Sequence, residues 1–406
     1  MKKPKIRFKG YQEDWEQRKF ADFTWDAGKR NNEDLDLEPY AITNEHGFIR
    51  QRDAHDDFGY MKDTDRKAYN IVQPNSFAYN PARINVGSIG YYKGVENVIV
   101  SSLYEVFQTD NYVNDRFLWH WLKSDEFPRW IEKLQEGSVR LYFYYDKLCE
   151  CQLYMPSLEE QEKIATFLDD LDHLITLHQR KCEETKTLKK YMLQKMFPQN
   201  GHSVPEIRFS GFTEDWEQRK LGELGSLKNG MNFSKEAMGI GFPFVNLQNI
   251  FGNNVIDVTN LGKAMASDSQ LKDYNLLNGD VLFVRSSVKL EGVGEAALVP
   301  QNLENTTYSG FIIRFRDEYG LDNNFKRFLF GIESVRNQIM AQATNSANKN
   351  ISQTVLENLC LKIPNKSEQE KIGLYFSNLD HLITLHQHKC EELQNIKKFM
   401  LKNMFI

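Results

Sequence analysis

The chain has 406 residues, of which 41% are hydrophobic, and a formal net charge of −5. This length allows two or three domains, each with its own core, and the acidic balance excludes a protein held on nucleic acid by overall positive charge. The N-terminus lacks the apolar stretch of a signal peptide, and no apolar run approaches the roughly 18 residues of a membrane span. With an odd number of cysteines (5), the sequence fits a reducing compartment, and we expect a cytoplasmic protein that contacts no membrane.

Residues 1–154 are predicted to form a first mixed domain, opened by a short arm at residues 1–19. Strand-like runs occur at residues 97–107 and 141–145, whereas residues 116–134 have a more helical pattern. The runs do not alternate regularly as in βαβ units, so the predicted class is α+β.

Residues 155–197 are predicted to form a long helix, running from Leu158 over roughly 60 Å at about 1.5 Å per residue. Ser157 followed by Glu160 has the spacing of a capping box at its start. Apolar side chains then recur at alternating steps of four and three residues, which predicts a seam against another helix. The predicted seam residues are Ile164, Leu168, Leu171, Ile175, His178 and Cys182.

After a linker at residues 198–205, the chain repeats this plan. Residues 206–362 are predicted to form a second mixed domain with its own arm at residues 206–220, and residues 363–406 a second long helix. Strands are expected at residues 281–285 and 310–316 of this domain, and Asn365 followed by Glu368 repeats the capping spacing. The second seam consists of Ile372, Phe376, Leu379, Ile383, His386 and Cys390.

The repeat is strongest in the helices and the arms. Residues 161–197 return as residues 369–405 without a gap, with 23 of 37 positions identical, and residues 5–19 return as residues 206–220, with 11 of 15 identical. The two mixed segments occupy equivalent places but align only in short pieces near their ends. The helices and arms form a repeated frame, whereas the mixed segments between them differ. This contrast predicts one scaffold that presents two different binding specificities.

The helix pattern alone leaves two alternatives open. The helices are either an exposed spacer or homodimeric coiled coil, or they pair with each other inside one chain. The domain-sized segment between the copies favours pairing within the chain, although the pattern does not decide between parallel and antiparallel pairing.

The sequence contains no P-loop, no metal-binding cysteine pair and no recognisable catalytic constellation. The mixed segments do contain clusters of Arg, Asn and Gln, the side chains that make bidentate contacts to bases, with small or basic neighbours. We select as candidate DNA-binding residues Asn44, Arg50, Gln51, Arg52, Arg83, Ser88 and Lys93 in the first segment, and Asn246, Gln248, Asn249, Arg285, Ser286, Ser287 and Lys289 in the second. For each of them, a solvated loop residue is the alternative.

The combination resembles the specificity (S) subunits of type I restriction–modification systems. The resemblance rests on the twofold EDWEQRK, on MPSLEEQEKIA and IPNKSEQEKIG leading into the LDHLITLHQ helices, and on NSANKNISQTVLEN before the second of these turns. It covers essentially the whole chain. It implies two target recognition domains that each bind one half of a bipartite DNA site, separated by two helices paired as an antiparallel coiled coil.

The resemblance also implies the partners. They are double-stranded DNA, two methylation subunits and the restriction subunits, and the S subunit itself is expected to be non-catalytic. S-adenosylmethionine, ATP and Mg would be bound by the partner subunits and no cofactor by this chain. The alternative interpretation is a DNA- or protein-binding regulatory adaptor built on the same coiled coil.

Overall fold

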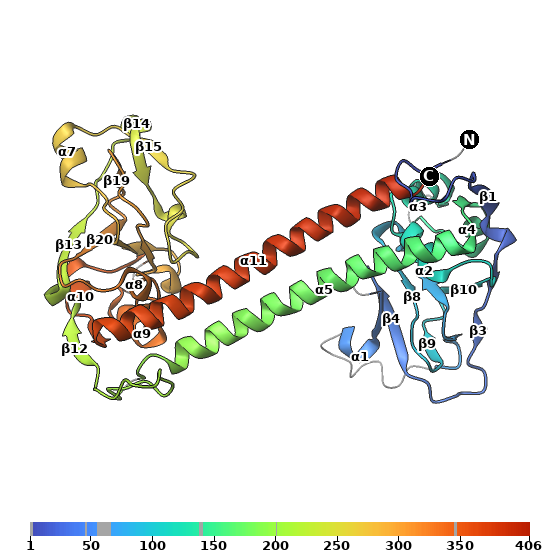
Figure 1. The fold of residues 1–406 in the computed structure, drawn as a ribbon, viewed down its shortest axis with the longest axis horizontal. Coiled ribbons are helices and arrows are strands. Elements are labelled where there is room, and N and C mark those ends of the chain that lie inside the picture. Colours follow the sequence, from blue (N-terminus) through green and yellow to red (C-terminus); the bar gives the residue numbers. More distant parts are fainter. Residues whose placement is uncertain (1–2, 45–46, 55–65, 138–140, 200, 345–346) are drawn as a thin grey trace. The chain divides into compact units, whose positions relative to one another are not determined.

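The structure, a computed structural model, describes residues 3–44, 47–54, 66–137, 141–199, 201–344 and 347–406. Its contacts divide the chain into two compact units, one formed by Met1–His178 with His388–Ile406 and the other by Gln179–Gln387. Each unit contains one mixed domain and adjoining parts of two long helices, α5 (Leu158–Lys195) and α11 (Lys366–Met404) (Figure 1). The predicted α+β class is confirmed.

The mixed domain of the first unit is built on two large sheets. Four antiparallel strands follow the order β2-β10-β7-β8, and five strands follow the order β3-β6-β9-β4-β5, in which β4 and β9 run parallel. The strands are β2 (Thr24–Asp26), β3 (Lys29–Arg30), β4 (Pro39–Thr43), β5 (Gly47–Arg50), β6 (Asn70–Val72), β7 (Phe77–Tyr79), β8 (Ile89–Tyr91), β9 (Val98–Val100) and β10 (Glu105–Thr109). The helices are α1 (Gln51–Ala54), α2 (Asp115–Leu122), α3 (Glu126–Leu134) and α4 (Tyr145–Glu150), with 3₁₀ turns at Phe20–Asp22 and Ile84–Val86.

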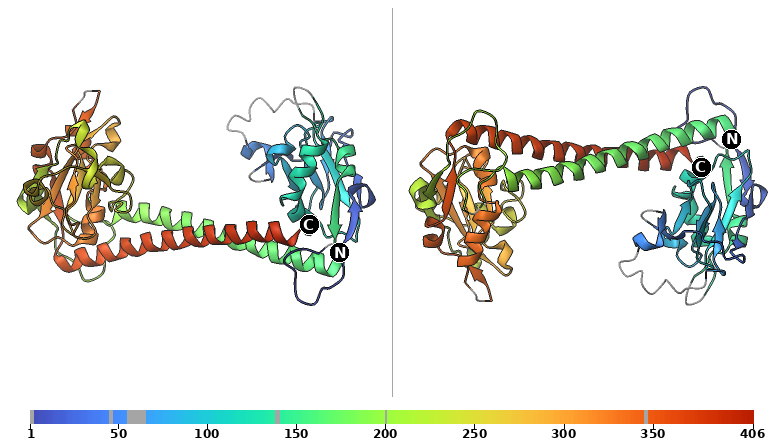
Figure 2. Two further views of the ribbon diagram at one scale, coloured as in Figure 1. Left: turned by 90° about the horizontal axis from the view of Figure 1, so that it is seen from above. Right: turned by 90° about the horizontal axis from the view of Figure 1, so that it is seen from below.

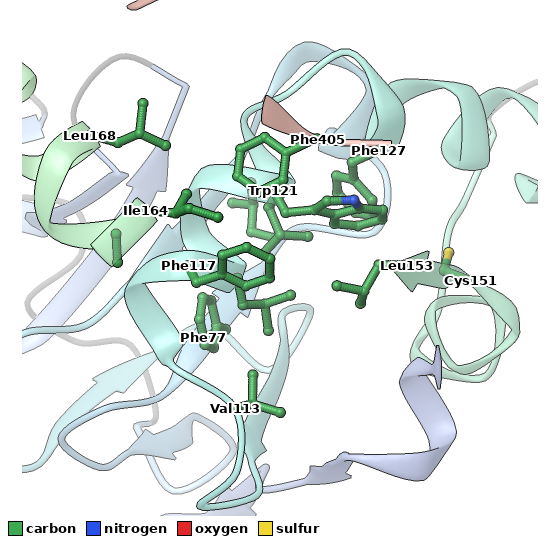
Figure 3. Packing of buried hydrophobic residues seen from close by; sticks show 14 of the residues in the cluster. Phe77, Val113, Phe117, Trp121, Phe127, Cys151, Leu153, Ile164, Leu168 and Phe405 are labelled. Atoms are coloured by element: carbon green, nitrogen blue, oxygen red, sulfur yellow. The ribbon is translucent and has the colours of Figure 1, made fainter. Parts of the chain in front are cut away.

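Alternation along the strands explains how this domain is layered. Phe77 packs on the helix side with Phe117 of α2 and with Ile164 and Leu168 of α5 (Figure 3). Phe107 belongs to the same cluster. Their neighbours on the same strands, Ala78 and Val106, face the opposite way and form a second core with the five-stranded sheet. The four-stranded sheet is therefore the middle layer of the domain.

The second unit repeats the middle layer. Its four-stranded sheet has the order β13-β20-β16-β18, again antiparallel, and smaller sheets β15-β14-β19 and β17-β21 take the place of the five-stranded one. The strands are β13 (Gly225–Asn229), β14 (Met238–Val245), β15 (Gly262–Ala264), β16 (Val281–Val284), β17 (Ser286–Ser287), β18 (Ala296–Leu298), β19 (Thr307–Tyr308), β20 (Ile312–Asp317) and β21 (Lys349–Asn350). The helices are α6 (Leu221–Leu224), α7 (Asp268–Asp273), α8 (Asn323–Leu329), α9 (Glu333–Gln342) and α10 (Gln353–Glu357), with 3₁₀ turns at Lys235–Ala237, Leu247–Asn249 and Leu290–Gly292.

In both units a two-stranded sheet joins the arm to the strand that leads into a long helix. β1 (Glu16–Lys19) pairs with β11 (Gln152–Met155), and β12 (Glu217–Lys220) pairs with β22 (Cys360–Ile363), both antiparallel. In each unit the sheets stand on one side of the helix pair (Figure 2). Among the described residues, no helix combines the length and the apolar character needed to span a membrane.

The two long helices pair antiparallel within each unit. In the first unit Lys397 contacts Asp172, and in the second unit Lys189 Nζ lies 2.5 Å from Asp380 Oδ1. Residues with higher numbers on α5 contact residues with lower numbers on α11. The helices therefore run antiparallel, which the sequence pattern had left open.

The helical pattern predicted at residues 116–134 is confirmed, and it forms two helices, α2 and α3. Two other local predictions need correction. Residues 141–145 are not a strand, because only Tyr142 makes a bridge, to Glu136, before α4 begins at Tyr145. The predicted capping boxes form only in part. Ser157 and Asn365 do accept the backbone N–H of Glu160 and Glu368, but the two glutamate carboxylates bind arginines of the arms.

Candidate nucleic-acid interface

Five of the seven candidates in the first domain are exposed: Asn44, Arg50, Arg52, Arg83 and Lys93. Asn44 follows β4 and Arg50 ends β5, so one hairpin carries both. The Nε of Arg50 donates to the hydroxyl of Tyr40 at 3.4 Å, and the guanidinium of Arg52 lies 3.7 Å from Glu38. This hairpin presents its basic side chains to solvent at the edge of the five-stranded sheet.

The other two candidates in this domain are buried. Gln51 begins α1 and is 6% exposed, while Ser88 is 4% exposed and donates its hydroxyl to the carbonyl oxygen of Ile42 at 2.8 Å. A hydroxyl that satisfies a buried carbonyl is held by the fold. We therefore leave both residues out of the proposed surface.

Lys93 lies at a hollow of about 680 Å³ between the domain and the helices. Burial of the ammonium group, with Arg116 nearby, lowers the pKa of Lys93 below its usual value. Aromatic rings make up much of the wall, and the lining residues include Tyr40, Phe48, Tyr91, Tyr92, Arg116, Trp119, Asp169 and Asp172.

Four candidates of the second domain lie together on the connection that follows β16: Arg285, Ser286, Ser287 and Lys289. Ser286 and Ser287 pair with Asn350 and Lys349 of β21, which fixes the backbone of this connection. Ser286, Ser287 and Lys289 line a hollow of about 530 Å³ together with Leu247, Phe251 and Phe311. The structure thus gathers residues that the sequence placed in one cluster.

The remaining candidates of this domain differ in their accessibility. Gln248 is exposed and Asn246 is half-buried, whereas Asn249 is 1% exposed. The side-chain carbonyl of Asn249 accepts the backbone N–H of Asn246 at 2.9 Å, and its amide donates to the carbonyl oxygens of Asp257 and Asn260. Because these bonds hold it inside a turn, we leave Asn249 out of the proposed surface.

Arg83 and Lys289 occupy corresponding connections in the two domains, β7 to β8 and β16 to β18. Each connection is held by a following segment in the same way. Phe143 donates its backbone N–H to the carbonyl oxygen of Pro81 at 3.1 Å, and Ile351 donates to that of Arg285 at 2.9 Å. The middle layers are therefore equivalent in topology and in this contact, while the residues exposed on the connections differ.

A repeated ion pair that our sequence reasoning missed attaches each arm to its helix. Arg7 donates two hydrogen bonds to Glu160 at 2.7 and 2.8 Å, and Arg208 does the same to Glu368 at the same distances. Both glutamate side chains are fully buried, and hydrogen bonding to them raises the pKa of both arginines. The identity of these residues in both copies was a signal available in the sequence.

The neighbouring glutamines are also used identically. Gln161 accepts the backbone N–H of Asn114 at 2.8 Å and donates to the carbonyl oxygen of Pro156. Gln369 accepts the N–H of Asp322 at 3.0 Å and donates to that of Pro364. Each glutamine thereby ties its long helix to the start of α2 or α8, so the frame holds each domain through the same contacts.

Most of the predicted seam residues are buried, but the helices are not their only neighbours. Within the second unit, Cys182 Sγ lies 4.0 Å from the carbonyl oxygen of Ile383 on the facing helix. Ile164 and Leu168 also belong to the core of the first domain, and Ile372 and Phe376 to that of the second. Three seam residues are half-buried, His178, Ile383 and His386, and the others are buried: Ile164, Leu168, Leu171, Ile175, Cys182, Ile372, Phe376, Leu379 and Cys390.

Among the described residues, one group has donor atoms close enough for a metal ion: His120, Asp169 and Asp172. Its charges are already balanced, because Arg116 makes a bidentate pair with Asp169 and Lys397 contacts Asp172. Burial opposes the charged carboxylate, but hydrogen bonds from His120 and Arg116 hold the pKa of Asp169 well below its usual range. Burial also lowers the pKa of His120, which is fully buried. This donor set fits an ion-pair network and does not fit a resident cation.

The repeat seen in the structure also appears in comparison with known families. The family model of the type I restriction modification DNA specificity domain matches residues 12–187 and again residues 213–395. The chain belongs to this family.

One curated relative matches nearly the whole chain and another matches about two thirds of it. The MjaVIII specificity subunit of a type I restriction enzyme from Methanocaldococcus jannaschii is 24% identical over 95% of this chain and 91% of its own length. The EcoKI specificity subunit from Escherichia coli K12 is 25% identical over 66% of this chain and 59% of its own length.

Solved structures of the same kind share the fold. The S subunit of a type I restriction–modification system from M. genitalium superposes with a TM-score of 0.58, at 14% identity, over 100% of this chain and 99% of that one. The HsdS subunit from Thermoanaerobacter tengcongensis gives a TM-score of 0.51, at 15% identity, over 97% of each chain. These likenesses confirm the architecture of two mixed domains and two long helices.

Proposed function

We propose that this chain selects the DNA sequence on which a type I restriction–modification complex acts, with each mixed domain reading one half of a bipartite site. Membership of the DNA specificity family gives the general function. We assign one half-site to each domain because the duplicated halves of the chain share a frame but differ elsewhere. The two domains share the middle sheet β2-β10-β7-β8 and β13-β20-β16-β18, while their connections and outer sheets differ.

Base contacts are best supported on the candidate residues that are exposed or half-buried. These residues are Asn44, Arg50, Arg52, Arg83 and Lys93 in the first domain and Asn246, Gln248, Arg285, Ser286, Ser287 and Lys289 in the second. Arg, Asn and Gln provide bidentate hydrogen bonds to base edges, and Lys provides contacts to phosphates. Residues 20–154 contain 22 acidic against 15 basic residues, so attraction to phosphate comes from these local clusters and not from the whole domain.

We further propose that the partners are double-stranded DNA, two methylation subunits and the restriction subunits. The repeated frame supports a pair of identical partners, because two copies of one surface suit two copies of one protein. Leu174 and Leu382 are equivalent residues of α5 and α11, and both remain exposed on the helix surface. A subunit of such a complex works where its DNA lies, which we propose to be the cytoplasm.

We assign the catalytic steps to the methylation and restriction subunits. We propose that S-adenosylmethionine, ATP and Mg bind to the methylation and restriction subunits and that this chain is non-catalytic. The ion-pair network around Asp169 supports this, since arginine and lysine already occupy the positions that a catalytic cation would need.

The test is reconstitution of the chain with the methylation subunit of its own system, followed by mapping of methylated positions on random-sequence DNA. We expect methylation at one bipartite motif with a fixed gap. Methylation by the chain alone would contradict the non-catalytic role. If the chain failed to associate with the methylation subunit but still bound DNA, the regulatory adaptor would be the correct interpretation.

A further inference from the structure

One surface of the second domain is unusually apolar for an exposed loop region. Val288 is 77% exposed and Phe311 is 58% exposed, and both line the hollow that also contains Ser286, Ser287 and Lys289. Exposed apolar groups gathered around a hollow mark a contact surface more often than scattered single residues do.

Phe311 is held rigidly in this exposed position. Its backbone N–H donates to Ser309 Oγ at 3.2 Å, and its carbonyl oxygen accepts the N–H of Arg285 at 2.7 Å. The preceding Gly310 approaches so closely that a Cβ there would lie 2.1 Å from Asn232 Oδ1. An apolar residue whose backbone is held in an ordered turn is partly prearranged for contact, because binding then has to order only its side chain.

The surroundings of Phe311 provide polar and charged groups of both signs. Two hydroxyls, Ser286 and Ser287, lie at the hollow with Lys289 exposed beside them, and Glu291 and Glu295 also line it. Glu295 accepts the backbone N–H of Gly252 at 3.0 Å, and among the described residues Lys289 forms no salt bridge with a carboxylate. An apolar centre with hydroxyls suits the edge of a base pair, and the free ammonium group of Lys289 suits a phosphate beside it.

The position in the fold favours DNA over a protein partner. Val288 and Phe311 lie in the part of the chain that differs between the two domains, whereas an invariant partner would use the repeated frame. The first domain presents another apolar residue, Leu103, at the equivalent place. Glu105 of β10 corresponds to Ile313 of β20, and Leu103 and Phe311 each lie two residues before these positions. Leu103 is 74% exposed.

We propose that Phe311, with Val288, contacts the C5 methyl group of a thymine in the major groove, so that the half-site read by the second domain contains an essential A·T pair. The methyl group is the apolar feature that distinguishes thymine in that groove. Lys289 contacts the adjacent phosphate. The inference rests on the proposed function and names the chemistry of one of its contacts.

The test measures binding of the complex, assembled from this chain and its methylation subunits, to duplexes carrying its motif. Each thymine is replaced in turn by deoxyuridine, which removes only the methyl group. At one or more positions of the half-site read by the second domain, we expect binding to weaken about fourfold to tenfold. Phe311→Ala should lose most of the difference between the thymine and uracil duplexes, because only Val288 is left to contact the methyl group.

Tyr319→Ala is the matched control. Tyr319 is also an exposed aromatic residue, but it follows β20 whereas Phe311 precedes it, so the two lie beyond opposite ends of one strand. This variant should keep the preference of the unaltered chain for thymine.

Three results would overturn the inference: no loss with uracil anywhere in that half-site, an unchanged preference for thymine in Phe311→Ala, or a half-site made of G·C pairs alone. Loss of the methylation subunits from the Phe311→Ala complex, with the thymine preference intact, would also overturn it and identify a protein-docking surface. A complex that binds DNA without any sequence preference would instead refute the proposed function.

Discussion

The two long helices are predicted to set the gap between the half-sites, and paired insertions test this. The insertions are heptads placed after His178 in α5 and after Gln387 in α11, at the boundaries between the two units. One heptad restores each helix face, so the seam continues. Because both helices are lengthened at the same level, Asp172 still meets Lys397 in one unit and Asp380 still meets Lys189 in the other.

The expected shift follows from helix and DNA geometry. Seven residues lengthen a helix by about 10 Å. At about 3.4 Å per base pair, this corresponds to a gap about three base pairs longer. Three base pairs also rotate one half-site by roughly 100° about the DNA axis, whereas a heptad turns the helix pair by only about 20°. We therefore expect the variant to methylate the lengthened motif less rapidly than the unaltered complex methylates its own.

The assay is mapping of the methylated motif in cells that contain the variant. A heptad in α5 alone is the control, because a continuous α5 can then keep only one of the pairs Asp172–Lys397 and Lys189–Asp380, which should destabilise the helix pair. An active paired variant that methylates sites with the original gap would refute the role of the helices as a spacer.

Three further predictions concern stability and DNA affinity. Arg208→Ala leaves the buried carboxylate of Glu368 without its partner, so we expect a loss of about 3–5 kcal/mol in the unfolding free energy of the second unit, measured with denaturant. Adding Glu368→Gln to this variant should recover part of the loss, and equal stability of all three proteins would contradict the prediction. The pKa of His120 is lower in the folded chain than its unfolded value of about 6.5, so this histidine costs no stability above about pH 6.5. As the pH falls from about 6.5 towards the folded-state pKa, the unfolded chain binds a proton that the folded chain does not, and the protein loses stability. His120→Gln should therefore make the melting temperature depend less on pH in this window, and an unchanged dependence would argue against a buried neutral His120. Lys289→Ala should reduce the slope of log affinity against log salt by about one unit with the motif unchanged, whereas an unchanged slope would remove Lys289 from the phosphate contacts.

The helices could be predicted closely from the sequence because their signals are local. The four-three spacing from Ile164 to Cys182 predicted a long helix, and the cap residues Ser157 and Asn365 predicted where the two helices start. Their antiparallel pairing depends on contacts such as that of Lys189 with Asp380, between residues far apart in the chain, which a periodic pattern does not contain.

The shared topology of the two domains could not be predicted by aligning them. Phe77 of β7 and Val281 of β16 hold equivalent places opposite Phe107 and Phe315, but the side chains differ because each core is filled in its own way. The aromatic tract at residues 141–145 looked like a strand from its composition. Instead, Phe143 packs into the core and its backbone bonds to Pro81, so tertiary packing overrides propensity.

The candidate site was predicted by residue type, which does not reveal burial. Ser88 and Asn249 have suitable groups for bases, but the fold uses these groups for the carbonyl of Ile42 and for a turn. Conversely, Phe311 was missed because a search for polar base-reading groups ignores apolar contacts. Its exposure depends on the turn at Ser309 and Gly310, which is evident only in the structure.

The central claim is that each domain reads one half-site independently, and exchange of residues 221–362 for the equivalent segment of another family member tests it most directly. The measurement is the methylated motif of cells carrying the exchanged chain with the same methylation subunits. We predict that one half of the motif changes while the other half and the gap remain. A motif in which both halves change, or neither does, would contradict the account.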